Sequence, residues 1–140
     1  MAKQTSLYLT KGIKVAQVTI TSTDTTTLKT LYTASADDAV VKSITCATDD
    51  TVVENLRIFL TVSGGSPIQI GTVNIPIGSG TTGSVSSVDI LNSIYLPSLP
   101  IDRNGKRILP LSAGTVVSVA CLATMTSAKT TSVTLIAEEY

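Results

Sequence analysis

The stretch KVAQVTITS, residues 14–22, alternates apolar and polar side chains and decides the fold class. Successive side chains of an extended chain point to opposite faces, so one face would carry Ala16, Val18 and Ile20. The opposite face would carry Val15 and two polar residues. This period of two is typical of a strand with one buried and one solvated face, and it predicts an antiparallel sheet.

Similar runs recur along the chain and are separated by clusters of turn residues. A change of face at Gly71–Thr72 predicts a β-bulge in one of them. The further strands are expected at residues 26–34, 39–48, 55–62, 67–77, 106–111, 115–124 and 132–140. This pattern predicts an all-β protein, an antiparallel β-sandwich of the jelly-roll kind with about eight strands.

One segment departs from the strand pattern and is the single place where a helix is expected. Near residues 88–94, Asp89 is placed to cap a short helix. Ile90, Leu91 and Ile94 would then face the interior.

The composition fits one β domain with few charges. Charged residues make up 14% of the 140 residues and hydrophobic residues 43%, so threonine and serine supply much of the polarity. β-Branched threonine suits a pleated surface better than a helix. We expect residues 14–140 to form a single domain and residues 1–13 to form an N-terminal arm.

Charge and hydropathy argue against several partners. The formal net charge is zero, whereas a nucleic-acid-binding surface needs an excess of cations, so no nucleic acid is expected. No apolar run approaches the ~20 residues that cross a bilayer, so no membrane is expected. The N-terminus has no apolar signal-peptide core, which favours synthesis in a cytoplasm.

The residue types also argue against an enzyme and against a cofactor. There is no histidine, which removes Ser-His-Asp and Cys-His nucleophiles and ordinary zinc sites. The adjacent carboxylates Asp37–Asp38, Asp49–Asp50 and Glu138–Glu139 would point to opposite faces of an extended chain, and the two aspartate pairs have the character of turns. No phosphate-binding or calcium-loop motif is present, so neither a cofactor nor a metal is expected.

The two cysteines, Cys46 and Cys121, both lie in strand-like runs. Two buried thiols are favoured over a disulfide in a reducing compartment, although the sequence leaves their pairing open.

The N-terminal segment carries Lys3, Lys11 and Lys14 with no acid among the first fourteen residues. It is either a solvated end or an arm that docks on a neighbouring subunit. In the second case Leu7, Tyr8 and Leu9 would be its apolar anchor, beside Lys11.

The most irregular stretch is LPSLPIDRNGKRILPLSAGT, residues 96–115. Its three prolines keep it out of the middle of a sheet, and Asn104–Gly105 predicts a two-residue hairpin turn. A stiff, extended excursion loses little entropy on docking, which suits a contact surface. The alternative is that its aliphatic residues cover one end of the sandwich.

Residues 27–140 resemble small structural proteins of tailed-phage virions, the decoration or cement class and their head-fibre relatives. The resemblance rests on the runs TLKTLYTA, VVKSITCAT, NLRIFLTV and IQIGTVNIPIGSGTTGS, on DILNSIYLPSLPIDRNGKRILPLSAGTVVSV, and on a last strand that ends in an acid and a tyrosine. It implies a β-sandwich without enzymatic activity that binds the outside of an assembled capsid as an oligomer.

The expected function is therefore a capsid decoration protein at the surface of the virion head, made in the host cytoplasm. Its partners would be the major capsid protein of a tailed phage and further copies of itself, as a trimer or dimer. A tail or head-fibre anchor and a host-surface or glycan-binding module are the alternatives. The expected contact residues are Leu7, Tyr8, Leu9, Lys11, Leu96, Pro97, Leu99, Pro100, Ile101, Arg103 and Arg107.

Overall fold

The computed structural model describes residues 11–140, and in this part of the chain the regular elements are nine strands and one 3-10 turn. The strands are β1 (Gly12–Thr21), β2 (Lys29–Thr33), β3 (Ala39–Thr48), β4 (Glu54–Thr61), β5 (Ile68–Ile75), β6 (Val88–Asp89), β7 (Leu109–Leu111), β8 (Val116–Cys121) and β9 (Thr130–Glu139), and the 3-10 turn is η2 (Ser22–Asp24). The all-β prediction is confirmed, with nine strands where about eight were expected.

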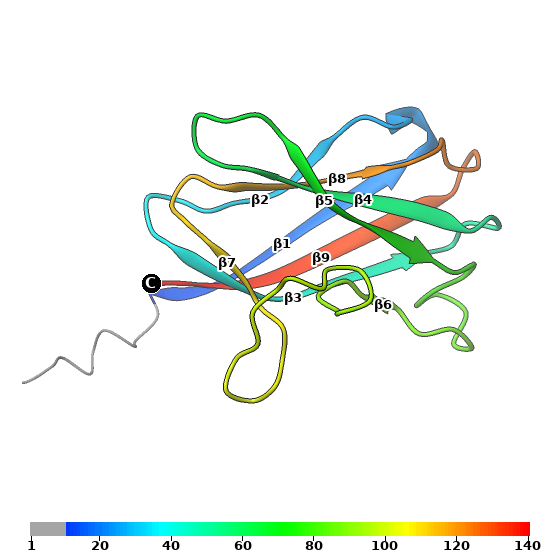
Figure 1. Cartoon of the computed structure of the whole chain (residues 1–140). Coiled ribbons are helices and arrows are strands. Elements are labelled where there is room, and N and C mark those ends of the chain that lie inside the picture. The colour runs from blue at the N-terminus through cyan, green and yellow to red at the C-terminus, as the bar shows by residue number, and fades with distance from the viewer. Residues whose placement is uncertain (1–10) are drawn as a thin grey trace, which may run out of the picture.

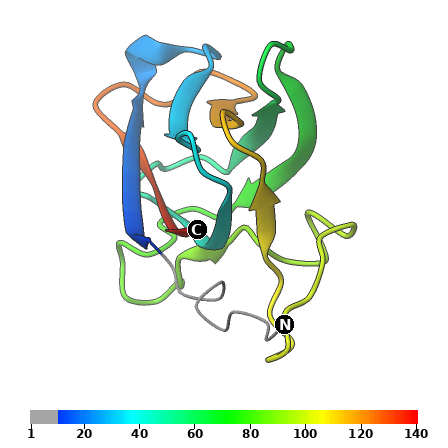
Figure 2. The ribbon, with the colours of Figure 1, turned by 90° about the vertical axis from the view of Figure 1, so that its left-hand side faces the viewer.

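The strands form two antiparallel sheets that pack face to face (Figures 1 and 2). The five-stranded sheet has the order β1-β9-β3-β6, and β7 also pairs with β3. The four-stranded sheet has the order β2-β8-β4-β5. The antiparallel sandwich predicted from the alternating pattern is confirmed.

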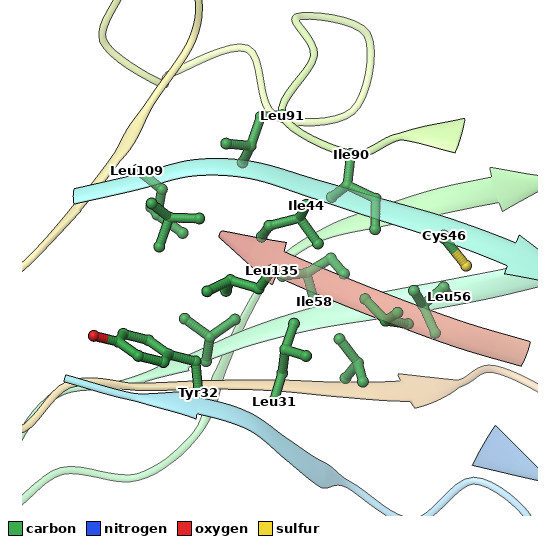
Figure 3. Close-up of a cluster of buried hydrophobic side chains, with 14 of the residues drawn as sticks. Leu31, Tyr32, Ile44, Cys46, Leu56, Ile58, Ile90, Leu91, Leu109 and Leu135 are labelled. Atoms are coloured by element: carbon green, nitrogen blue, oxygen red, sulfur yellow. The ribbon is translucent and has the colours of Figure 1, made fainter. Parts of the chain in front are cut away.

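The core lies between the two sheets and is built from the inward row of each strand. On β9 every second residue from Thr131 to Glu139 is buried, as the period of two requires. Figure 3 shows side chains from both sheets meeting in this layer, among them Ile44, Leu56, Ile58 and Leu135. Burying an aliphatic side chain of this size contributes about 1.5–3 kcal/mol, so the layer is the main source of stability.

The predicted β-bulge is present in β5. The register between β4 and β5 shifts between Ile58 and Phe59 and leaves Ile70 as the extra residue. The prediction placed the bulge at Gly71–Thr72, one position further on. A Cβ atom on Gly71 would lie 2.6 Å from Leu96 Cδ2 and 2.9 Å from the Tyr95 carbonyl oxygen, so only glycine lets that segment approach β5 so closely.

Within residues 11–140, no helix has the length and apolar character needed to cross a membrane.

Candidate contact surface

Most of the irregular stretch lies in the connection between β6 and β7, and both of these strands pair with β3. β6 pairs with β3 at Thr45 and Cys46, and β7 pairs with β3 from Ala39 to Val41. The connection between β6 and β7 therefore starts and finishes at one edge of the five-stranded sheet. It runs past the open side of the sandwich, where β5 is the edge strand of the other sheet (Figure 1).

The first part of this connection, residues 90–96, closes that open side, and we call it the edge cover. Ile90 is fully buried, and Leu91 and Leu96 are 5% and 3% exposed. Leu96 also lies against Gly71 of β5. Leu96, one of the expected contact residues, therefore belongs to the core of this chain.

The short helix expected near residues 88–94 does not form. Val88 and Asp89 are in β6, and the N–H of Ile90 donates to the carbonyl oxygen of Ile44 at 2.9 Å. Pairing of Val88 and Asp89 with β3 keeps the first two residues of the expected helix in an extended strand. The Asn92 side chain then accepts the N–H of Ile94 at 2.8 Å and forms a turn. Ile94, expected to face inward, is 79% exposed.

The second part, residues 100–107, is a hairpin that extends away from both sheets, and we call it the projecting hairpin (the yellow loop at the bottom of Figure 1). Ile101 and Arg107 form an antiparallel bridge at its base. The Asp102 carboxylate accepts the N–H groups of Asn104 and Lys106, each at 2.9 Å. These bonds hold the tip in one conformation although it is exposed.

The turn of the hairpin differs from the prediction. A two-residue type I′ turn at Asn104–Gly105 needs positive φ at both residues. Only Gly105 has positive φ, at 81°, and its N–H donates to the Asp102 carbonyl oxygen at 3.0 Å. The Asp102 N–H donates to the Lys106 carbonyl oxygen at 2.8 Å, so three residues connect the strands. The hairpin therefore has a three-residue loop closed by a glycine with positive φ, the next most common kind after the two-residue loop.

Arg107 and Leu99, both expected contact residues, tie the hairpin to the sandwich. Arg107 Nη1 donates to the carbonyl oxygens of Leu99 at 2.8 Å and Pro97 at 3.4 Å. The Leu99 side chain is half-buried against the core. It lines an apolar hollow of about 170 Å³ together with Leu60, Ile70, Leu96, Pro97, Ser98 and Leu109.

The other expected contact residues of this stretch are exposed. Pro97, Pro100 and Arg103 lie on the surface, and Ile101 is 57% exposed. The chain turns at Pro97, where the Leu99 N–H donates to the Leu96 carbonyl oxygen at 3.4 Å, and Pro100 restricts the backbone next to Ile101, so Ile101 is presented from a rigid base. These four residues form a surface available for contact.

The N-terminal candidates are placed only in part. Leu7, Tyr8 and Leu9 lie outside the described residues. Lys11 is exposed, and its ammonium forms an ion pair with Asp37 at 2.7 Å. β1 begins at Gly12, and the domain boundary expected after residue 13 stays a prediction.

Asp50 and Glu54 form a buried pair of carboxyl groups, although the sequence did not indicate that the two side chains would lie together. Asp50 is 1% exposed and accepts the N–H groups of Val52 and Thr126, both at 3.1 Å, and Glu54 is 4% exposed. Burial, followed by the hydrogen bond with Asp50, raises the pKa of Glu54 to about 7. Burial would raise the pKa of Asp50, but hydrogen bonds from Glu54, Thr126 and Val52 outweigh it and lower that pKa.

The two cysteines, whose pairing the sequence left open, are free and buried. Burial is the largest cause that raises the pKa of each thiol to about 12, so both stay protonated near neutral pH. Within residues 11–140, no group of three or more His, Cys, Asp or Glu side chains is placed to hold a metal ion.

No protein-family model and no curated protein matches the chain. One solved structure with a similarity is a chain from the capsid asymmetric unit of cyanophage Pam1, at 16% identity and a TM-score of 0.45, covering 94% of this chain and 86% of that one. Another is from the structure of infectious bursal disease virus Gt strain, at 16% identity and a TM-score of 0.30, covering 93% of this chain and 38% of that one.

Proposed function

We propose that the protein is a non-enzymatic virion structural protein: a capsid decoration, or cement, protein of a tailed phage. In this role it binds the outer surface of the major capsid lattice and stabilises the head. Copies arranged as dimers or trimers would repeat one contact patch around the symmetry axes of the lattice. The family resemblance of residues 27–140 supports the proposal.

The observation that carries the proposal is the projecting hairpin. It presents Ile101, 57% exposed, between Pro100 and the cation Arg103. An exposed aliphatic side chain on a rigid base is a suitable anchor for a pocket between capsid subunits, because little conformational entropy is lost on docking. Arg107 fixes the base through two carbonyl oxygens, so the hairpin can transmit load to the sandwich.

The test is co-sedimentation of the purified protein with capsids that lack it. Ile101→Asp should weaken binding by at least about 10-fold, because a charge would replace an apolar anchor. Ile94→Asp is the matched control, since Ile94 is a still more exposed isoleucine of the same connection outside the hairpin. Leu99→Asp is a poorer probe because Leu99 packs against the core and its loss would also disturb the fold.

Equal binding of the wild-type protein and Ile101→Asp would contradict the hairpin as the contact. Binding to tails or fibres in place of empty heads would favour the anchoring alternative, and clear hits on a glycan array would favour the glycan-binding alternative. A second readout is thermal rupture of heads, which should occur at lower temperature when the protein is absent.

A further inference from the structure

The outer face of the five-stranded sheet is divided into a polar and an apolar half. Toward the end of β1 this face carries Gln17 and Thr19, and Gln17 Nε2 donates to Thr134 Oγ1 at 3.3 Å. Toward the start of β1 it carries four of the chain's exposed large hydrophobic residues, which we call the apolar half-face. They are Ile13, Val15, Ile136 and Tyr140, and they are 67%, 64%, 39% and 38% exposed.

These four residues are neighbours across two strands. Val15 lies directly opposite Ile136, and Ile13 lies opposite Glu138 in the same register. Tyr140 points to the same face as Glu138, and its hydroxyl donates to a Glu138 carboxylate oxygen at 3.2 Å. A solvated sheet face normally carries polar side chains, so a grouped apolar half-face indicates a contact site.

The apolar half-face borders a backbone edge that pairs with no other strand within residues 11–140. β1 is the terminal strand of its sheet, so alternate N–H and C=O groups of β1 point away from β9 and can receive a further strand. Figure 2 shows β1 (dark blue) as the outer strand at the left of the view. The polar end of this strand is occupied by the chain itself, because Lys29 Nζ donates to the Thr19 carbonyl oxygen at 2.7 Å.

The size of the half-face fits a short extended segment better than a second globular surface. Two strands by about five residues cover roughly 10 by 17 Å. A stable interface between folded proteins buries about 800 Å² on each partner, several times that area. An added strand needs less area because its main-chain hydrogen bonds supply part of the affinity.

A segment of matching pattern precedes β1 in the same sequence. The run SLYLT, residues 6–10, places Leu7 and Leu9 on one side of an extended chain, about 6.8 Å apart. The same spacing separates Ile13 and Val15 on β1. If residues 6–10 formed a strand beside β1, Leu7 and Leu9 would therefore extend the apolar row of Ile13 and Val15 across that strand.

The position of Lys11 favours an occupant from another copy. Lys11 and Gly12 already lie against β9, with the Lys11 N–H donating to the Glu139 carbonyl oxygen at 2.6 Å. A hairpin back onto the same β1 needs at least two turn residues, which would be Leu9 and Thr10. The turn would then consume part of the apolar run. A fully extended segment of ten residues reaches at most about 36 Å, enough to meet a neighbour.

We propose that residues 5–10 of one copy add as a strand to the β1 edge of a second copy, with Leu7 and Leu9 packed beside Ile13 and Val15. The site is incomplete without the partner, since the added strand comes from it. When each copy both donates one segment and receives one, the exchange produces a closed symmetric oligomer. The inference concerns the protein in solution and stands apart from capsid binding.

The test compares masses by analytical ultracentrifugation over a range of concentrations. The full chain should associate, and a variant lacking residues 2–9 should be monomeric. Val15→Asp should weaken association by at least about 30-fold, because it puts a charge into the apolar row. Thr19→Asp is the matched control on the same strand and face, in the polar half, and should change association by less than about 3-fold.

A second measurement detects the added strand directly and does not require that an oligomer form. A fluorescent peptide of residues 1–12 should bind the variant lacking residues 2–9, and Val15→Asp in that variant should abolish binding. A monomeric full chain would overturn the proposal. So would association that survives deletion of residues 2–9, which would instead indicate direct contact between two apolar half-faces. Failure of the peptide to bind would also overturn it.

Discussion

The edge cover and the projecting hairpin are neighbours in one stretch of chain but have opposite relations to the core. The edge cover places Ile90, Leu91 and Leu96 in the gap between the sheets, where all three are buried. The projecting hairpin leaves Ile101 more than half exposed and is held by hydrogen bonds to Asp102 and from Arg107. Irregular sequence therefore serves closure of the sandwich in one part and presentation of a surface in the other.

The comparison shows how an open sandwich edge is managed in this fold. β3 and β5 would otherwise leave apolar rows facing water on that side, and sheet edges and apolar gaps both favour aggregation. Two short strands on β3 and the edge cover between them remove this exposure. The chain that continues from the cover is then free to extend outward.

The largest expected difference between the two regions is in stability. Leu96→Ala should lower the free energy of unfolding by about 2–5 kcal/mol, because it leaves a cavity against Gly71 and the core. Ile101→Ala should change it by no more than about 0.5 kcal/mol, because that side chain is mostly in water. Urea denaturation followed by circular dichroism measures both. Similar losses for the two variants would show that cover and hairpin are one packed unit.

The next difference is in the response to pH. In the sandwich, Glu54 has a pKa of about 7, raised from the ordinary value of 4.5. The folded protein therefore keeps a proton that the unfolded chain releases. The contribution of Glu54 to the free energy of unfolding falls as pH rises from about 4.5 to 7 and then stays constant up to about pH 8. The fall should be on the order of 1–3 kcal/mol.

Glu54→Gln should remove most of this dependence between pH 5 and pH 8, since the amide cannot ionise beside Asp50. Glu138→Gln, which removes the same charge from the outer face of β9, is the control and should retain it. Denaturation of the three proteins at both pH values makes the measurement. If the free energy of unfolding of Glu54→Gln changed between pH 5 and pH 8 as much as that of the wild-type protein, the buried pair would not be the cause of the pH dependence.

The smallest expected effect is the pH dependence of the projecting hairpin. It has the opposite sign to that of Glu54, because acid disturbs the hairpin. Hydrogen bonds from the N–H groups of Lys106 and then Asn104 lower the pKa of Asp102 below 3.8. The order that these bonds give the hairpin is present above that pH and is lost as pH falls through the lowered value. Amide resonances of Asn104 and Lys106 should shift on acidification toward pH 2, and in Asp102→Asn they should not titrate. Their constancy in the wild-type protein would contradict the role of Asp102.

Local sequence patterns predicted most of the fold but less of the contact surface. The alternation in β1, β3 and β9 is a property of each strand alone, so the sandwich was predictable. The helix near residues 88–94 was predicted wrongly because β3, which pairs with Val88 and Asp89 and accepts the N–H of Ile90, is distant in sequence. Leu96 and Ile101 are both aliphatic residues next to a proline, so the sequence does not distinguish them. Leu96 is buried and Ile101 is exposed because only Leu96 packs against β5, which is distant in sequence.

The carboxyl pair was missed for a related reason. Asp50 follows β3 and Glu54 begins β4, and each alone has the character of a turn or strand-end residue. Spacing of four in a loop gives no fixed distance between side chains. A polar residue placed on the inward row of a strand, as Glu54 is relative to Leu56 and Ile58, was the available signal.

The position of β9 has a consequence for folding kinetics. β9 pairs with β1 on one side and with β3 on the other, and it follows every other strand in the described chain. The five-stranded sheet therefore cannot form on the ribosome until β9 has emerged, and β1 waits unpaired during all that synthesis. Pairing of Gly12 with Glu139 gives the fold a high contact order, so refolding should be slow, in the range of milliseconds to seconds. During this interval the unpaired β1 exposes apolar side chains and a free strand edge, so aggregation competes with folding.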